Sequence, residues 1–166
     1  MFRDQGVIEI QPDEKPVVVP HAVEAKTLFE QLHGNVYRAF ETRGEEQTYR
    51  QLQVCVTNDL VPELYLDIHE SLVMRRQQGA YCKLESVDVR EVEVLAEQQP
   101  WLVVDDEIAD RPRFDVRCVW QADGVVSHWG HEHRRTNEHE AEFAVVHDGQ
   151  SWKIAALNTL YHDRID

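Results

Sequence analysis

FDVRCVWQ, residues 114–121, places an apolar side chain at every second position. Successive side chains of a β-strand point to opposite faces of the sheet, so the four apolar residues share one face. The stretch therefore predicts a β-strand with one buried face. Its apolar residues are Phe114, Val116, Cys118 and Trp120.

Further β-rich runs follow this strand and are separated by turn signals. The dipeptides Asp123-Gly124 and Asp148-Gly149 are typical of type I′ hairpin turns. Between them we expect two strands joined by a turn near residues 135–137, with a final strand over residues 152–161. The last third of the chain thus predicts an antiparallel meander.

The first half of the chain shows helical spacing instead. Over residues 21–42, apolar side chains recur every three or four positions, as they do on one face of an α-helix. A second, shorter helix is indicated around residues 49–56, and a third begins at Asn58 or Asp59 and ends at Gly79. The apolar face of the first helix consists of Leu28, Phe29, Leu32, Val36, Tyr37 and Phe40.

Residues 80–112 connect the two halves. Val87 and Val89 alternate with charged residues, and the phase then slips to Val92 and Val94, which predicts a long strand with a bulge. Residues 96–112 predict a long acidic loop, and loops of that length are often functional.

We predict an extended, proline-containing leader or linker over residues 1–19 and a single α+β domain over residues 20–166. Pro12, Pro16 and Pro20 exclude a helix at the start of the chain. We expect helices packed on a curved, mostly antiparallel sheet.

The composition limits the classes of partner. With 31 acidic and 17 basic side chains, the formal net charge is −14, which disfavours nucleic acid and anionic lipid surfaces. The N-terminus is too polar for a signal peptide, and no apolar run is long enough for membrane insertion. We expect a soluble domain, and it could belong to a membrane-anchored protein.

The sequence HWGHEH, residues 128–133, followed by His139, is the most unusual local feature. On a strand, Trp129, His131 and His133 share a face, and a hairpin would bring His139 beside them. Three imidazoles could bind zinc or act as an acid or base. Because a fourth ligand and an orienting carboxylate are missing from the pattern, we predict no metal and no catalytic residue here.

The order of the expected elements resembles the cone-shaped nuclear-transport-factor-2-like fold. Within that superfamily the chain is most similar to the mitochondrial import-motor anchor domain and its bacterial relatives, over residues 25–162. The resemblance lies in the run from Asn35 to Gly44 and in the closing Trp152-Lys153-Ile154. It implies a concave sheet over a long helix, a scaffold that hosts both enzymes and binding domains.

We therefore predict a non-catalytic domain that binds an unknown small molecule or protein without a cofactor, as an accessory part of a longer protein. The alternative is a small-molecule isomerase, dehydratase or cyclase that uses a cavity histidine and a carboxylate. A homodimerisation module is a third possibility. The predicted ligand-binding residues are Trp120, Trp129, His131, His133 and His139.

Overall fold

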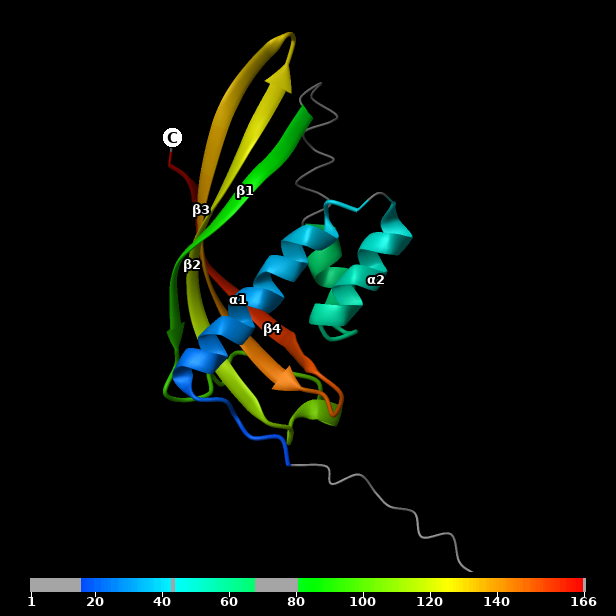
Figure 1. Cartoon of the computed structure of the whole chain (residues 1–166), viewed down its shortest axis with the longest axis vertical. Coiled ribbons are helices and arrows are strands. Elements are labelled where there is room, and N and C mark those ends of the chain that lie inside the picture. Colours follow the sequence, from blue (N-terminus) through cyan, green and yellow to red (C-terminus); the bar gives the residue numbers. More distant parts are fainter. Residues whose placement is uncertain (1–15, 43, 68–80, 166) are drawn as a thin grey trace, which may run out of the picture.

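The chain is an α+β protein in which helices precede a four-stranded antiparallel sheet (Figure 1). The computed structural model describes residues 16–42, 44–67 and 81–165. A third helix is described over residues 61–67, so its predicted end at Gly79 lies outside the described residues. The other elements are α1 (Ala22–Ala39), α2 (Glu45–Cys55), β1 (Tyr81–Val94), η1 (Asp106–Ile108), β2 (Arg113–His128), β3 (His131–His147) and β4 (Trp152–Arg164).

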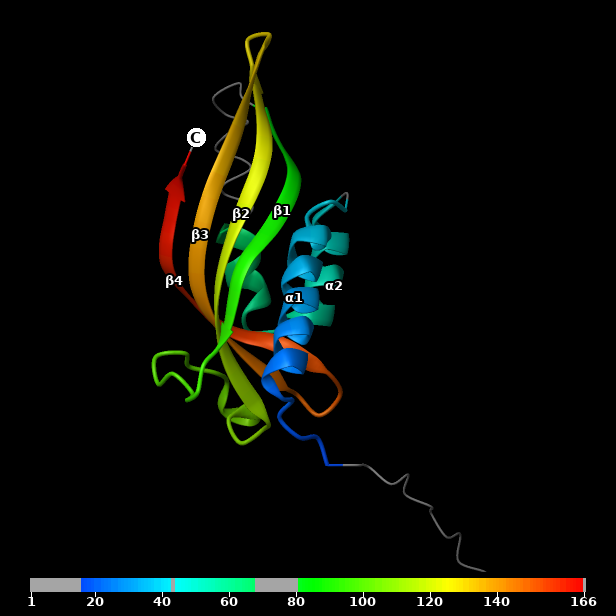
Figure 2. The ribbon, with the colours of Figure 1, turned by 60° about the vertical axis from the view of Figure 1, so that its left-hand side comes forward.

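The four strands form a meander in the order β1-β2-β3-β4. The sheet is curved, α1 and α2 lie over one of its faces, and the far end of the β2–β3 hairpin projects beyond the helices (Figure 2). No helix in these described ranges is long and apolar enough to cross a bilayer. The predicted leader, residues 1–19, lies mostly outside the described residues.

The core forms between the apolar face of α1 and the inner face of the sheet. Phe29 is fully buried, and Leu32 and Val36 are each 6% exposed, as the helical spacing predicted. Burying a side chain of this size stabilises the fold by about 1.5–3 kcal/mol relative to leaving it exposed. The four alternating residues of β2 are all buried opposite this helix, which confirms the predicted strand.

The predicted bulge and acidic loop are both present. The β1–β2 register shifts between Val89 and Glu91, where the sequence pattern changes phase. The chain then leaves the sheet from Leu95 to Pro112, with η1 as its only regular element. The turn predicted at Asp148-Gly149 also joins two strands, and Gly149 has a φ of 102°.

The hairpin turns predicted at Asp123-Gly124 and near residues 135–137 are both wrong. Strands β2 and β3 pair without a break up to His128 and His131, so Trp129 and Gly130 form the turn. The Asp123-Gly124 dipeptide lies inside β2, because the Asp123 carboxylate accepts hydrogen bonds from Ser86 and Thr136 on the two neighbouring strands. These cross-strand bonds replace the bonds to its own backbone that a turn would offer.

Trp129 occupies a backbone conformation that favours glycine or asparagine. Its φ is 49° and that of Gly130 is 80°, the positive pair that a type I′ turn requires. The indole is 88% exposed, so packing does not compensate for this strain. We expect Trp129→Asn to raise the free energy of unfolding by about 1 kcal/mol in urea denaturation.

Gly130→Ala is the matched test in the opposite direction. The space around Gly130 is open, so only its positive φ penalises a side chain there. We expect Gly130→Ala to lower the free energy of unfolding by about 1 kcal/mol in urea denaturation. Equal stability of the two variants would contradict this account of the turn.

A buried ion pair holds the acidic loop against the sheet. The Asp115 carboxylate is 1% exposed and lies 2.7 Å from Nε of Arg113. It also accepts a 2.7 Å hydrogen bond from the backbone N–H of Gln99. The Arg113 guanidinium donates to the carbonyl oxygens of Gln99 and Leu102, at 3.2 Å and 3.0 Å. Strand β2 thereby fixes the backbone of residues 99–102.

We expect Asp115→Ala to lower the free energy of unfolding by about 3–5 kcal/mol, because it leaves a buried guanidinium without its counter-charge. Asp88→Ala provides the control, since Asp88 pairs with Arg90 at an exposed site. This variant should lower the free energy of unfolding by less than about 1 kcal/mol. Similar urea midpoints for the two variants would show that the buried pair does not anchor the loop.

Candidate functional site

The five predicted site residues separate into two places. Trp120 and His139 are cross-strand partners in the middle of the sheet. Trp129, His131 and His133 are exposed at the end of the β2–β3 hairpin. Residues 131 and 139 lie eight positions apart on β3, about 26 Å along the strand, so His139 is not beside the HxH pair as predicted. Among the described residues, no group of three or more ligating side chains could hold a metal ion.

The inner face of the sheet carries a row of stacked rings. Trp120 of β2 stacks on His139 of β3 with ring centroids 5.0 Å apart, and His139 stacks on His162 of β4 at 4.4 Å. The register places these three residues directly opposite one another across the strands. The Trp120 indole also donates a 2.7 Å hydrogen bond to the Tyr37 hydroxyl on α1.

His33 of α1 closes this row from the helical side. Its side chain is 3% exposed, and its ring lies 4.7 Å from Trp120 and 5.3 Å from Tyr37. Phe29 and Phe143 flank it at 5.6 Å and 6.0 Å. Neither ring nitrogen has a hydrogen-bond partner among the described residues. We refer to His33, Tyr37, Trp120, His139 and His162 as the inner cluster.

Burial controls the protonation of the inner cluster. It lowers the pKa of His33 to about 4, with a smaller contribution from His139. Burial also lowers the pKa of His139 to about 4, assisted by His162. It raises the pKa of Tyr37 to about 12, although the hydrogen bond from Trp120 opposes the change. His33, His139 and the Tyr37 hydroxyl are therefore neutral at pH 7, and among the described residues no carboxylate orients the His33 ring as general-base chemistry requires.

The pKa of His33 is lower in the folded chain than in the unfolded chain. Between about pH 6.5 and pH 4, the unfolded chain therefore binds more protons than the folded chain. The free energy of unfolding therefore falls as the pH falls through this window. Between about pH 7.5 and pH 5, His33 alone should account for a loss of about 2 kcal/mol.

We expect His33→Leu to remove this share of the pH dependence in urea denaturation at the two pH values. His131→Gln is the control, since His131 is exposed at the hairpin end, and it should keep the parent slope. An unchanged slope in His33→Leu would show that the imidazole protonates freely in the folded protein.

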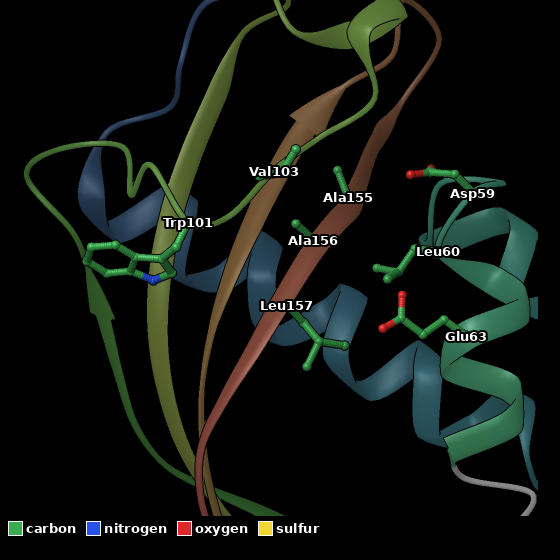
Figure 3. Close-up of a pocket in the computed structure, with 8 residues that line it drawn as sticks. All are labelled: Asp59, Leu60, Glu63, Trp101, Val103, Ala155, Ala156 and Leu157. Atoms are coloured by element: carbon green, nitrogen blue, oxygen red, sulfur yellow. The ribbon is translucent and has the colours of Figure 1, made fainter.

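A groove beside β4 was not predicted from the sequence. One hollow of about 170 Å³ lies between the segment of residues 59–63 and the acidic loop, over β4 (Figure 3). A second hollow of about 170 Å³ shares Asp59 with it, so we treat the two as one β4 groove. Its lining is Thr57, Asn58, Asp59, Leu60, Glu63, Trp101, Val103, Asp105, Glu107, Ile108, Asp148, Lys153, Ala155, Ala156 and Leu157.

The groove brings together segments that are far apart in the sequence. Trp101 stands on one side of β4 and Asp59, Leu60 and Glu63 on the other (Figure 3). The Trp101 indole donates a 2.9 Å hydrogen bond to Glu142 of β3, and yet its side chain remains 55% exposed. In the sequence, only Trp101, next to Pro100 in the acidic loop, could have indicated this site. Its position opposite Asp59 depends on the tertiary fold.

The second hollow contains one ion pair. Lys153 Nζ lies 3.1 Å from Asp148. Burial alone would raise the pKa of Asp148, but hydrogen bonds from the backbone N–H groups of Ser151 and Gln150 and the contact with Lys153 outweigh it and lower the pKa to about 2. Asp148 therefore stays ionised and holds Lys153 in place.

Comparison with known proteins gives no assignment. No protein-family model and no curated protein matches the chain. Among solved structures, the intermembrane space region of chloroplast protein ARC6 is similar, with a TM-score of 0.48 and 16% sequence identity over 85% of this chain and 97% of that one. A likeness this distant identifies neither a family nor an activity.

Proposed function

We propose that the chain is a non-catalytic protein-binding domain. The observation that supports this most is the filled space between α1 and the sheet, where an enzyme of the isomerase or cyclase type would hold its substrate. Phe29, His33, Trp120 and Phe143 occupy that space with ring contacts of 4.7–6.0 Å. The hollows among the described residues lie on the outside instead, beside β4.

The inner cluster fits a structural role in this proposal. A catalytic histidine needs a partner that fixes its tautomer and access to a substrate. His33 is buried without a hydrogen-bond partner among the described residues, and His139 is stacked between Trp120 and His162. These contacts favour packing over proton transfer.

We further propose the nuclear-transport-factor-2-like fold for the chain. Its support is the order of the elements: helices, a long bulged strand, an acidic loop and an antiparallel meander. In this proposal the side chains of the inner cluster fill the cone that relatives with enzymatic activity leave open. The fold alone does not decide between binding and catalysis.

Photo-crosslinking in cells that express the protein tests the proposed function. A photoreactive phenylalanine derivative would replace Trp101 in the groove or Trp129 at the hairpin end, and Val54, 64% exposed on α2, would serve as the control position. We expect a discrete protein adduct at Trp101, Trp129 or both, and none at Val54. An adduct with the mass of a second copy would identify the partner as this chain itself.

The contrary result is equally clear. Absence of a protein adduct at both tryptophan positions, together with thermal stabilisation by small hydrophobic ligands, would overturn the proposal. Such stabilisation would mean that the interior opens to admit a ligand.

A further inference from the structure

The β4 groove has a strong excess of negative charge. Its single basic side chain, Lys153, is already bound to Asp148. None of the other four carboxylates forms an ion pair with a described residue. They belong to Asp59, Glu63, Asp105 and Glu107. A cationic partner would be attracted to this surface and would lose little hydration in an open groove.

A buried hydroxyl in the same groove also lacks a partner. Thr57 is 6% exposed and lines the second hollow, and its Oγ1 forms no hydrogen bond with any described residue. Buried hydroxyl groups in proteins normally have a partner, so this oxygen is an unsatisfied polar group beside the second hollow. This hydroxyl is a separate observation from the carboxylates, and Thr57 lies two positions before Asp59 in the chain.

The carboxylates of the groove do not form a group of three that could hold one metal ion. A divalent cation needs several oxygens within about 2.0–2.6 Å of one point. No three acidic or histidine side chains of the described residues converge in this way. The charges are instead distributed along the groove, from Glu63 in the first hollow to Asp105 and Glu107 in the second. Several cationic groups on one extended chain would match that distribution.

The opposite wall of the groove is apolar. Trp101 is 55% exposed and Val103 77% exposed, although Leu102 between them is buried at 2% and packs on Ala144 and Ala156. The hydrogen bond from Trp101 to Glu142 and the anchored carbonyl of Leu102 hold this wall in place. It therefore presents apolar surface that is already ordered before a partner binds.

We propose that the β4 groove binds an extended basic segment of a partner protein, in which lysine or arginine alternates with apolar residues. Alternate side chains of an extended peptide point to opposite sides. The cationic ones would meet Asp59 and Glu63, and the apolar ones would meet Val103 and, at the outer edge of the groove, Trp101, whose indole points away from Asp59 (Figure 3). The small side chains of Ala155 and Ala156 leave room for the peptide backbone. This inference rests on the proposed protein-binding function and specifies its surface.

Fluorescence anisotropy with a labelled synthetic peptide of about ten residues, alternating lysine and valine, tests the inference. Such a peptide spans about 33 Å when extended. We expect saturable binding at low salt that weakens at high salt, and no binding of the glutamate–valine counterpart. The double variant Asp59→Asn/Glu63→Gln should weaken binding about tenfold, and Trp101→Ala should weaken it without changing the charge.

The control removes two charges elsewhere. Glu24→Gln/Glu41→Gln changes two exposed residues outside the groove and gives the same net charge as the groove variant. It should bind the peptide like the parent. Equal weakening in both double variants would mean attraction by net charge alone and would overturn the inference, as would the absence of saturable binding. Thermal melts establish that each variant is folded.

The two proposals fail separately. If the peptide does not bind but photo-crosslinking still gives a protein adduct at Trp129, protein binding stands and the groove is not its surface. If neither experiment detects an interaction, both proposals are wrong.

Discussion

The ion pair between Asp115 and Arg113 determines where the acidic loop lies. Two residues of one strand, both withdrawn from water, bind the backbone of Gln99 and Leu102 at the start of that loop. Such a pair is tolerated when additional hydrogen bonds satisfy the buried charges, as they do here. Without it, the wall that carries Trp101 would keep only the hydrogen bond to Glu142 and the packing of Leu102 as anchors.

The inner cluster imposes a second constraint, on the opposite side of the sheet. A row of rings on three strands requires β2, β3 and β4 to stay in register, because a slip of one residue would turn Trp120 and His139 to the other face. Filling this space with Trp120 and Phe143 stabilises the fold and removes the cavity that catalysis would need. The same packing that makes the domain stable therefore leaves the outer surfaces as the place for the proposed binding.

Local patterns in the sequence were sufficient for most of the elements, but they broke β2 and β3 with turns at Asp123-Gly124 and near residues 135–137. Period-two alternation in residues 114–121 and helical spacing in residues 21–42 correspond to buried faces. The turn was misplaced because Asp123-Gly124 has a strong hairpin signature, whereas Trp129-Gly130 has a weak one. Cross-strand hydrogen bonds of Asp123 overrode the local preference, and no rule based on neighbouring residues includes them.

The candidate site was harder to predict for the same reason. The pairing of Trp120 with His139 depends on register, which the misplaced turn shifted. The groove depends on contacts between three segments more than 30 residues apart, residues 57–63, 101–108 and 148–157. Each segment alone contains ordinary surface residues: a pair of acids near a helix start, an acidic loop and a hairpin turn. Only the folded chain collects their carboxylates along one apolar wall, and that combination is the basis of the proposed preference for a basic partner.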